Sequence, residues 1–169
     1  DEVIVGAVAD GAGSAKHADI GAKLAVKIAL RYLAGTEEWL QKRHNSWQTQ
    51  PNPPTDELAR KLFTKVVNKV SFGLEKQAIN HGYYVEDLAC TLLAFIATPD
   101  WIAAMQIGDG FIVTRSPKTD YQLVFQPDKG EFVNQTTFVT SANALSEMQV
   151  KVLLHPPTFI CASTDALEK

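Results

Sequence analysis

Three aspartates in this chain each follow an apolar segment and precede a small residue. Asp10 ends the run V-I-V-G-A-V-A-D, Asp109 lies in I-G-D-G, and Asp165 ends C-A-S-T-D. Apolar and β-branched runs predict strands, so each carboxylate is expected where a strand ends. Magnesium and manganese prefer shells of carboxylate, carbonyl and water oxygens. Because neighbouring carboxylates repel one another unless a cation lies between them, the recurring pattern indicates a metal site.

Each aspartate also has a simpler interpretation. Asp-Gly is a common hairpin-turn dipeptide, which applies to Asp10 and more strongly to Asp109, because strands are predicted on both sides of Asp109. Asp165 stands where it would cap a following helix. The glycine-rich loop after Asp10 has the composition of a phosphate-binding loop, but Lys16 stands where the dinucleotide-binding pattern needs its third glycine.

Other catalytic chemistry has less support in the sequence. The four histidines are isolated from one another and no C-x-x-C occurs, so no zinc-ligand spacing is present. There is no G-x-S-x-G nucleophile motif, and Ser14, although near Asp10, has no identifiable base beside it. Cys90 and Cys161 both lie in apolar segments, which predicts small buried side chains rather than a disulfide framework.

The order of predicted elements indicates an α+β protein. A strand over 3–9 is followed by a helix over 19–34 that Gly35 should end, a further helix over 37–47, and a long amphipathic helix over 55–81. The rest of the chain reads as an antiparallel series of strands. Their predicted ranges are 88–97, 101–107, 111–114, 121–125, 136–140, 150–154 and 158–162.

Composition narrows the class of protein. The chain has 169 residues, of which 46% are hydrophobic and 21% charged, as expected of one globular domain. A net charge of −3 with scattered Lys and Arg argues against a nucleic-acid partner. No apolar run is long enough to span a membrane and no leader is visible, so a cytoplasmic location is expected. Both ends fall within predicted elements, so the single domain over 1–169 is expected to be incomplete.

Five motifs occur together in a recognisable order. They are G-A-V-A-D-G-A-G-S-A, C-T-L-L, I-G-D-G, G-E-F-V-N-Q-T-T-F-V-T-S and C-A-S-T-D-A-L-E. This ordered set resembles the metal-dependent protein phosphatase family (PPM, type 2C), and within it the bacterial branch. The resemblance extends over nearly the whole chain. It implies a four-layer αββα sandwich, in which two antiparallel sheets are flanked by helices, and removal of phosphate from Ser/Thr phosphoproteins with two Mn²⁺ or Mg²⁺ ions.

The resemblance also implies roles for individual residues. Asp10 matches the aspartate that bridges the two metals, and Gly11 matches the glycine whose carbonyl binds one of them. Asp165 matches a further metal ligand. Asp109 matches an aspartate near the metals that can act through water, and Thr91 matches a threonine with a supporting role. The implied mechanism is in-line attack by a metal-bridging water, without a phosphoenzyme.

The sequence departs from the family pattern in two visible places. Ala12 stands where many members have a histidine proposed as general acid, for which His17 is a weak substitute, and Ala166 replaces a glycine. The family's phosphate-binding arginine and its final Asp-Asn motif are expected outside residues 1–169. These departures motivate an alternative, a catalytically inactive interaction or sensing module with the same fold. A nucleotide-binding domain using the 10–16 loop is the third hypothesis. The oligomeric state is left open.

Overall fold

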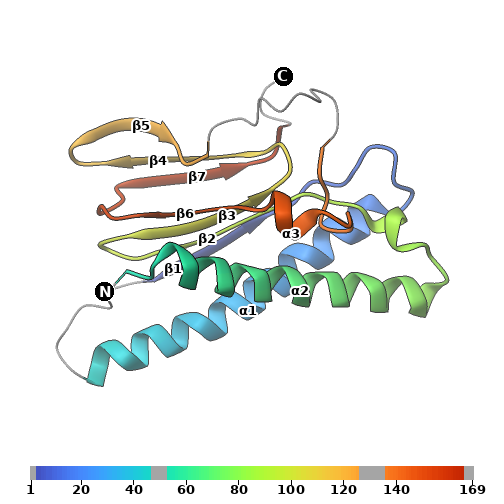
Figure 1. Ribbon diagram of the computed structural model, residues 1–169, viewed down its shortest axis with the longest axis horizontal. Coiled ribbons are helices and arrows are strands. Elements are labelled where there is room, and N and C mark those ends of the chain that lie inside the picture. The colour runs from blue at the N-terminus through green and yellow to red at the C-terminus, as the bar shows by residue number, and fades with distance from the viewer. Residues whose placement is uncertain (1–2, 47–52, 126–135, 166–169) are drawn as a thin grey trace.

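Two antiparallel sheets form the centre of the molecule (Figure 1). The computed structural model describes residues 3–46, 53–125 and 136–165, with only the backbone for 37–46. The larger sheet has the strand order β1-β2-β3-β6, and the smaller one has the order β5-β4-β7. The larger sheet comprises β1 (Ile4–Val8), β2 (Leu92–Ala97), β3 (Ile102–Ile107) and β6 (Gln149–Leu153). The smaller sheet comprises β4 (Phe111–Ser116), β5 (Thr119–Leu123) and β7 (Phe159–Ser163).

The two central strands of the larger sheet are covered on both faces. Every residue of β2 and β3 is buried, which explains their uninterrupted apolar sequences. On one face, side chains such as Ile102 and Ala104 pack against Ile112 of the smaller sheet. On the other face, alternate residues such as Ala103 and Met105 belong to the core shared with the helices.

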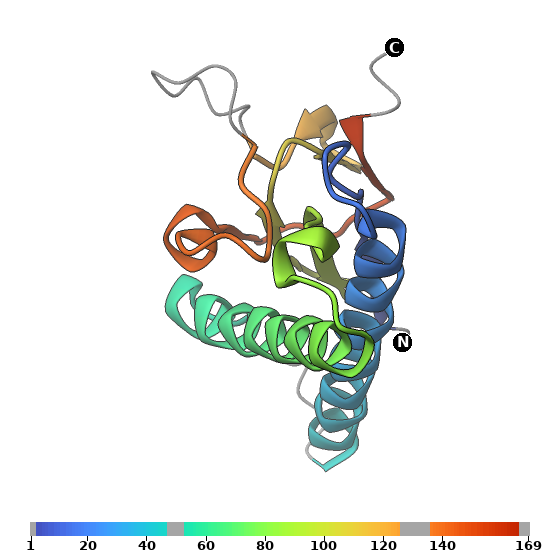
Figure 2. The same ribbon diagram turned by 90° about the vertical axis from the view of Figure 1, so that its right-hand side faces the viewer.

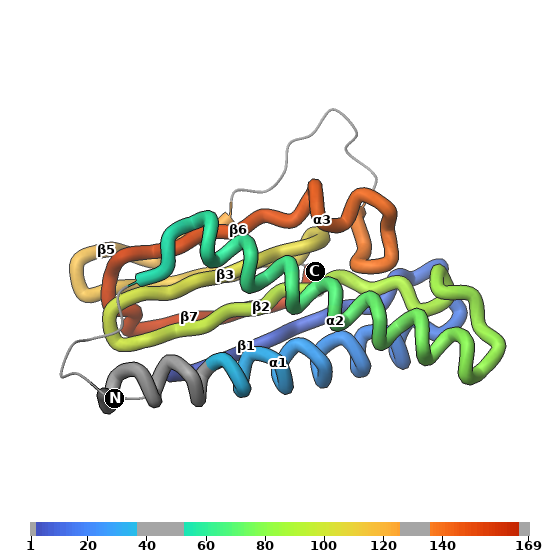
Figure 3. Tube along the Cα trace, turned by 60° about the horizontal axis from the view of Figure 1, so that its bottom comes forward, coloured from blue at the N-terminus to red at the C-terminus, as the bar shows by residue number. Residues whose placement is uncertain are grey.

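Helices α1 (Ala18–Ser46) and α2 (Asp56–His81) form the layer outside the larger sheet (Figure 3). Ala25, Ala29 and Leu33 of α1 are fully buried, as are Phe63 and other residues of α2. The predicted periodicity of both helices is therefore confirmed. The α+β class and the two antiparallel sheets covered by helices on this outer face are confirmed. The second outer helical layer of the expected four-layer sandwich is not found among the described residues.

One predicted helix boundary is wrong. Gly35 does not end the first helix, because α1 continues without a break to Ser46 and absorbs the separate helix predicted over 37–47. A glycine ends a helix when it adopts a left-handed conformation, and Gly35 does not have a positive φ. A glycine inside a helix costs only about 1 kcal/mol relative to alanine, which a long packed helix tolerates.

The boundaries of α2 agree with the helix predicted over 55–81. Thr55 caps its start, where the Thr55 hydroxyl accepts the Leu58 N–H at 3.2 Å. Gly82 ends it with a φ of 69° and donates its own N–H to the Ala78 carbonyl.

The strand predicted over 136–140 is also wrong. This segment is a loop that bends into a turn, where the Phe138 N–H donates to the Ser141 hydroxyl at 3.0 Å. A backbone hydrogen bond from the Val139 N–H to the Cys90 carbonyl, at 2.8 Å, joins this loop to the segment that precedes β2. The predicted strand 88–97 begins later, because Val85–Leu88 forms a short 3-10 helix, η1. A one-turn helix, α3 (Ala144–Glu147), was not predicted.

No helix among the described residues combines the length and apolar character that crossing a membrane requires.

Candidate metal centre

Asp10 follows β1, and hydrogen bonds from its backbone to Thr91 fix its position. Its N–H donates to the Thr91 hydroxyl at 3.0 Å, and the Thr91 N–H donates back to the Asp10 carbonyl at 2.8 Å. Gly11 then forms an isolated antiparallel bridge with Cys90. The antiparallel pairing of β1 with β2 thus extends to residues that follow β1 and residues that precede β2. Asp10 is half-buried and its backbone position is set by the sheet.

Gly11 is required by close packing rather than by an unusual backbone angle. A Cβ added to Gly11 would lie 2.6 Å from the Ala18 Cβ and 2.8 Å from the Ala18 carbonyl oxygen. The first turn of α1 therefore packs directly on the residue after Asp10. A Cβ added to Gly13, in contrast, would meet no atom within 4 Å.

The end of this loop is also anchored. The His17 N–H donates to the Asp87 carbonyl at 2.8 Å, and the His17 ring stacks on Tyr83 with centroids 3.8 Å apart. The ring forms no hydrogen bond with the described residues, and a role of His17 in proton transfer stays a prediction. Ala12 is buried and donates its N–H to the Ala89 carbonyl at 2.9 Å.

Asp109 lies in the turn that joins the two sheets. Gly108 has a φ of 107°, and a Cβ there would lie 2.5 Å from the Thr91 Cγ2. A Cβ on Gly110 would lie 2.5 Å from the Ser163 carbonyl oxygen. The turn is therefore wedged between the residue that holds Asp10 and the last residue of β7. The Asp109 side chain is exposed, and its Oδ2 accepts the Thr136 hydroxyl at 2.9 Å.

Asp165 comes two residues after the end of β7 and is half-buried. Because Ser163 pairs with Phe111 at the start of β4, Asp165 leaves the smaller sheet beside the turn that carries Asp109. The structure therefore brings the ends of β1, β3 and β7 to one end of the two sheets, which Figure 2 views directly. This arrangement agrees with the predicted placement of all three aspartates.

The structure does not gather the three carboxylates into one ligand set. Within residues 3–46, 53–125 and 136–165, no group of three or more His, Cys, Asp or Glu residues lies close enough to hold a metal ion. The donor chemistry nevertheless fits Mg²⁺ or Mn²⁺, since the oxygens are hard ligands. None of the three carboxylates forms an ion pair with another described residue, and the pairs Lys23–Asp19 and Lys61–Glu57 lie within α1 and α2. No cationic side chain among the described residues therefore forms an ion pair with them. Ala166 lies outside the described residues.

A hollow of about 770 Å³ opens beside Asp10 and the first turns of α1. Gly11, Gly13 and Lys16 line it together with Asp10. Lys16 is exposed and forms no ion pair with an acidic residue among those described, so it brings an unpaired positive charge to the same hollow as Asp10. A single lysine in a loop is not distinctive in a sequence, so residue type and position alone predict no functional role for Lys16.

Comparison with known proteins shows the family and the fold of the chain. A sequence model of the protein phosphatase 2C family matches residues 1–169. The serine/threonine-protein phosphatase 3 of Escherichia coli (strain K12) is 32% identical over 162 residues, which cover 96% of this chain and 58% of that protein. The chain therefore spans little more than half the length of this relative.

Solved structures share the fold at low sequence identity. The catalytic domain of the serine/threonine protein phosphatase PstP, in complex with two manganese ions, superposes with a TM-score of 0.59 at 14% identity, over 98% of this chain and 70% of that one. A bacterial serine phosphatase superposes with a TM-score of 0.59 at 11% identity, over 96% and 67% of the two chains. The chain belongs to the protein phosphatase 2C family, and its two-sheet core is the fold of bacterial members.

Proposed function

We propose that the protein is a Mn²⁺- or Mg²⁺-dependent serine/threonine phosphoprotein phosphatase. The observation that carries the proposal is the meeting of the ends of β1, β3 and β7, each followed by an aspartate, in a chain of this family. The 32% identity to a serine/threonine phosphatase supports the reaction class. The manganese ions of PstP support the choice of cofactor.

Asp10, the Gly11 carbonyl and Asp165 would hold two divalent cations, with Asp109 acting directly or through water. When bound, the cations would lower the pKa of the attacking water and neutralise charge on the phosphoryl oxygens.

The chain's own contribution is positional. The paired hydrogen bonds between Asp10 and Thr91 keep the Asp10 backbone at the end of the sheet, and Gly11 permits the loop to pack against α1. Lys16 would attract the anionic phosphoryl group into the hollow beside Asp10.

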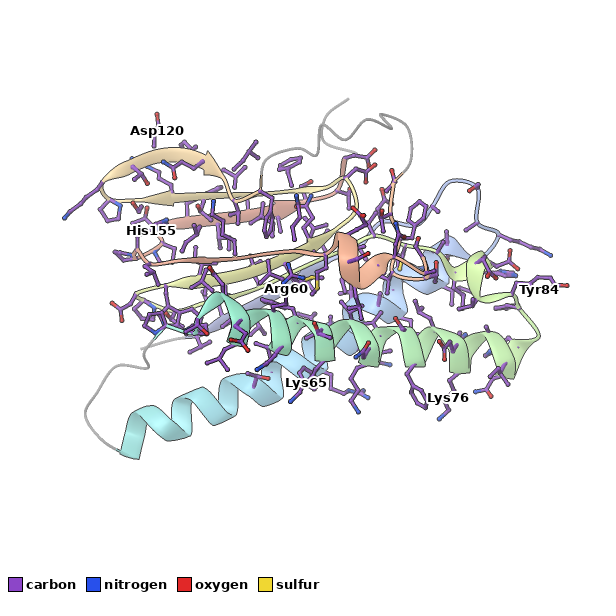
Figure 4. All side chains as sticks on the ribbon, in the orientation of Figure 1. Arg60, Lys65, Lys76, Tyr84, Asp120 and His155 are labelled. Carbon is purple, nitrogen blue, oxygen red and sulfur yellow. The ribbon has the colours of Figure 1, made fainter. Side chains whose placement is uncertain are left out.

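The test is hydrolysis of a phosphoserine or phosphothreonine peptide and of p-nitrophenyl phosphate by the full-length protein, with Mn²⁺ and with EDTA. We expect turnover with Mn²⁺ and a loss of at least about 100-fold in Asp10→Asn, because an amide is a far weaker ligand than a carboxylate. Asp120→Asn is the matched control. Asp120 is an exposed aspartate on β5, at the opposite end of the sheets (Figure 4). Turnover that is unaffected by EDTA and by Asp10→Asn would rule out the proposed function.

A second candidate is an inactive module with the same fold. It is favoured by the buried Ala12 in place of a histidine and by the absence of a three-acid group among the described residues. Mn²⁺ binding without turnover in the same assay would support this second candidate.

A further inference from the structure

Gln106 is a polar residue on an otherwise apolar strand face. It ends the alternation of β3 that places Ile102 and Ala104 between the two sheets, so its side chain shares their face. Only 7% of the residue is exposed. A buried amide must find hydrogen-bond partners to offset the loss of water.

The partners of Gln106 flank Asp109. Its Nε2 donates to the Gly108 carbonyl at 3.1 Å and to the Gly110 carbonyl at 2.7 Å. Its Oε1 is buried without a partner in the described chain. If the amide were flipped, Oε1 would face two carbonyl oxygens and could accept no hydrogen bond from them. The hydrogen-bond network therefore supports the orientation in which Nε2 faces the carbonyls.

These two bonds act on a turn that already has little freedom. Gly108 packs against Thr91, and Gly110 packs against the Ser163 carbonyl. Gln106 holds the carbonyls on either side of Asp109 toward the interior. Asp109 itself remains exposed at the surface of the turn.

We propose that Gln106 is a positioning residue for the metal centre. By donating to both carbonyls it fixes the Gly108–Gly110 turn, so that the Asp109 carboxylate is presented in one position to a divalent cation at the strand ends. This inference rests on the metal dependence in the proposed function. Residues that orient a ligand typically change metal affinity by about 10- to 100-fold when replaced.

The test uses Gln106→Met in the full-length protein, because methionine keeps the chain length and has no N–H to donate. The matched control is Gln149→Met. Gln149 pairs with Gln106 across β3 and β6, lies on the same face, and forms no side-chain hydrogen bond within the described residues. Mn²⁺ affinity is measured by titration calorimetry, and the Mn²⁺ concentration for half-maximal hydrolysis of p-nitrophenyl phosphate is measured beside it.

We expect Gln106→Met to weaken Mn²⁺ binding by about 10- to 100-fold, with turnover recovering at saturating Mn²⁺. Gln149→Met should stay within about twofold of the unmodified protein, because it removes no bond to the turn. Gln106→His retains one ring N–H and should recover part of the affinity. A folded Gln106→Met protein with unchanged Mn²⁺ affinity would overturn the proposal.

A second measurement needs no substitution. In the unmodified protein the side-chain NH₂ protons of Gln106 should exchange with solvent far more slowly than those of Gln149, as followed by NMR. Equal exchange rates would overturn the proposal even if Gln106→Met does not fold. Absence of turnover in the unmodified protein would count against the phosphatase assignment alone, because the calorimetric comparison still tests Gln106. Absence of Mn²⁺ binding would overturn both.

Discussion

Gly11 and Gly13 are two residues apart in the loop after Asp10, but only Gly11 is tightly packed. We expect Gly11→Ala to lower the free energy of unfolding by about 1–3 kcal/mol, because its Cβ would meet Ala18 at 2.6 Å. Gly13→Ala has open space and should stay within about 0.5 kcal/mol. Urea denaturation followed by circular dichroism checks both variants. Equal effects of the two substitutions would contradict the packing of Gly11 on α1.

Cys90 is a residue whose burial can be tested chemically. Both cysteines are free, and burial raises the pKa of the Cys90 thiol from its ordinary value of 9.0 to about 12. The folded protein should therefore resist alkylation at Cys90 at pH 8, whereas the half-buried Cys161 should react faster. Peptide mass spectrometry after iodoacetamide treatment measures both rates. Rapid labelling of Cys90 in the folded protein would contradict its burial.

The same pKa shift predicts how stability depends on pH. The thiol of the unfolded chain ionises near pH 9, whereas that of the folded chain ionises only near pH 12. Between these values the unfolded state binds fewer protons, so the contribution of Cys90 to stability is complete below pH 9 and is lost as the pH rises toward 12. Cys90→Ala should show a shallower alkaline decline in unfolding free energy than the unmodified protein. Identical slopes would show that another group is responsible.

At the scale of the element, two helix glycines should respond to the same substitution with opposite signs. Gly82 ends α2 with a φ of 69°, a conformation that alanine disfavours, so Gly82→Ala should destabilise the protein by about 1 kcal/mol. Gly35 lies inside α1 with no atom within 4 Å of an added Cβ. Gly35→Ala should therefore stabilise the protein by up to about 1 kcal/mol. Thermal unfolding of both variants compares the signs, and a destabilising Gly35→Ala would argue against a continuous α1.

The helices also show where sequence patterns are informative. Apolar periodicity and caps predicted α2 almost to the residue, because Thr55 and Gly82 act through local hydrogen bonds. Gly35 carried the same local signal as Gly82, but α1 continues through it. The difference is a backbone conformation that the identity of a residue does not determine.

At the scale of the whole molecule, the two sheets must stay packed for the three strand ends to meet. Ile112 is fully buried between the sheets, on the strand that follows Asp109. Ile112→Ala should lower the free energy of unfolding by about 2–5 kcal/mol, through lost apolar burial and the cavity left behind. Ile79 is 80% exposed on α2, so Ile79→Ala should have an effect within about 0.5 kcal/mol. Denaturant titration measures both, and comparable losses would contradict the placement of Ile112 between the sheets.

The class of fold, the resemblance to the family and the candidate ligands can all be predicted from residue types and their order along the chain. These follow from local information: apolar runs that end in aspartate, glycines at fixed offsets, and ordered motifs. These patterns predict that Asp10, Asp109 and Asp165 each follow a strand, and the structure places them after the ends of β1, β3 and β7.

How those strand ends meet, and which residues hold them, depends on three-dimensional packing. Thr91 supports Asp10 from a position 81 residues away. Gln106, which no motif singled out, holds the turn of Asp109 from between the sheets. The structure also shows that the three loops lie at the same end of the sheets, although their carboxylates do not form one ligand group among the described residues. Such contacts join residues far apart in the chain and depend on sheet register and layer packing, which no local pattern of residue types encodes.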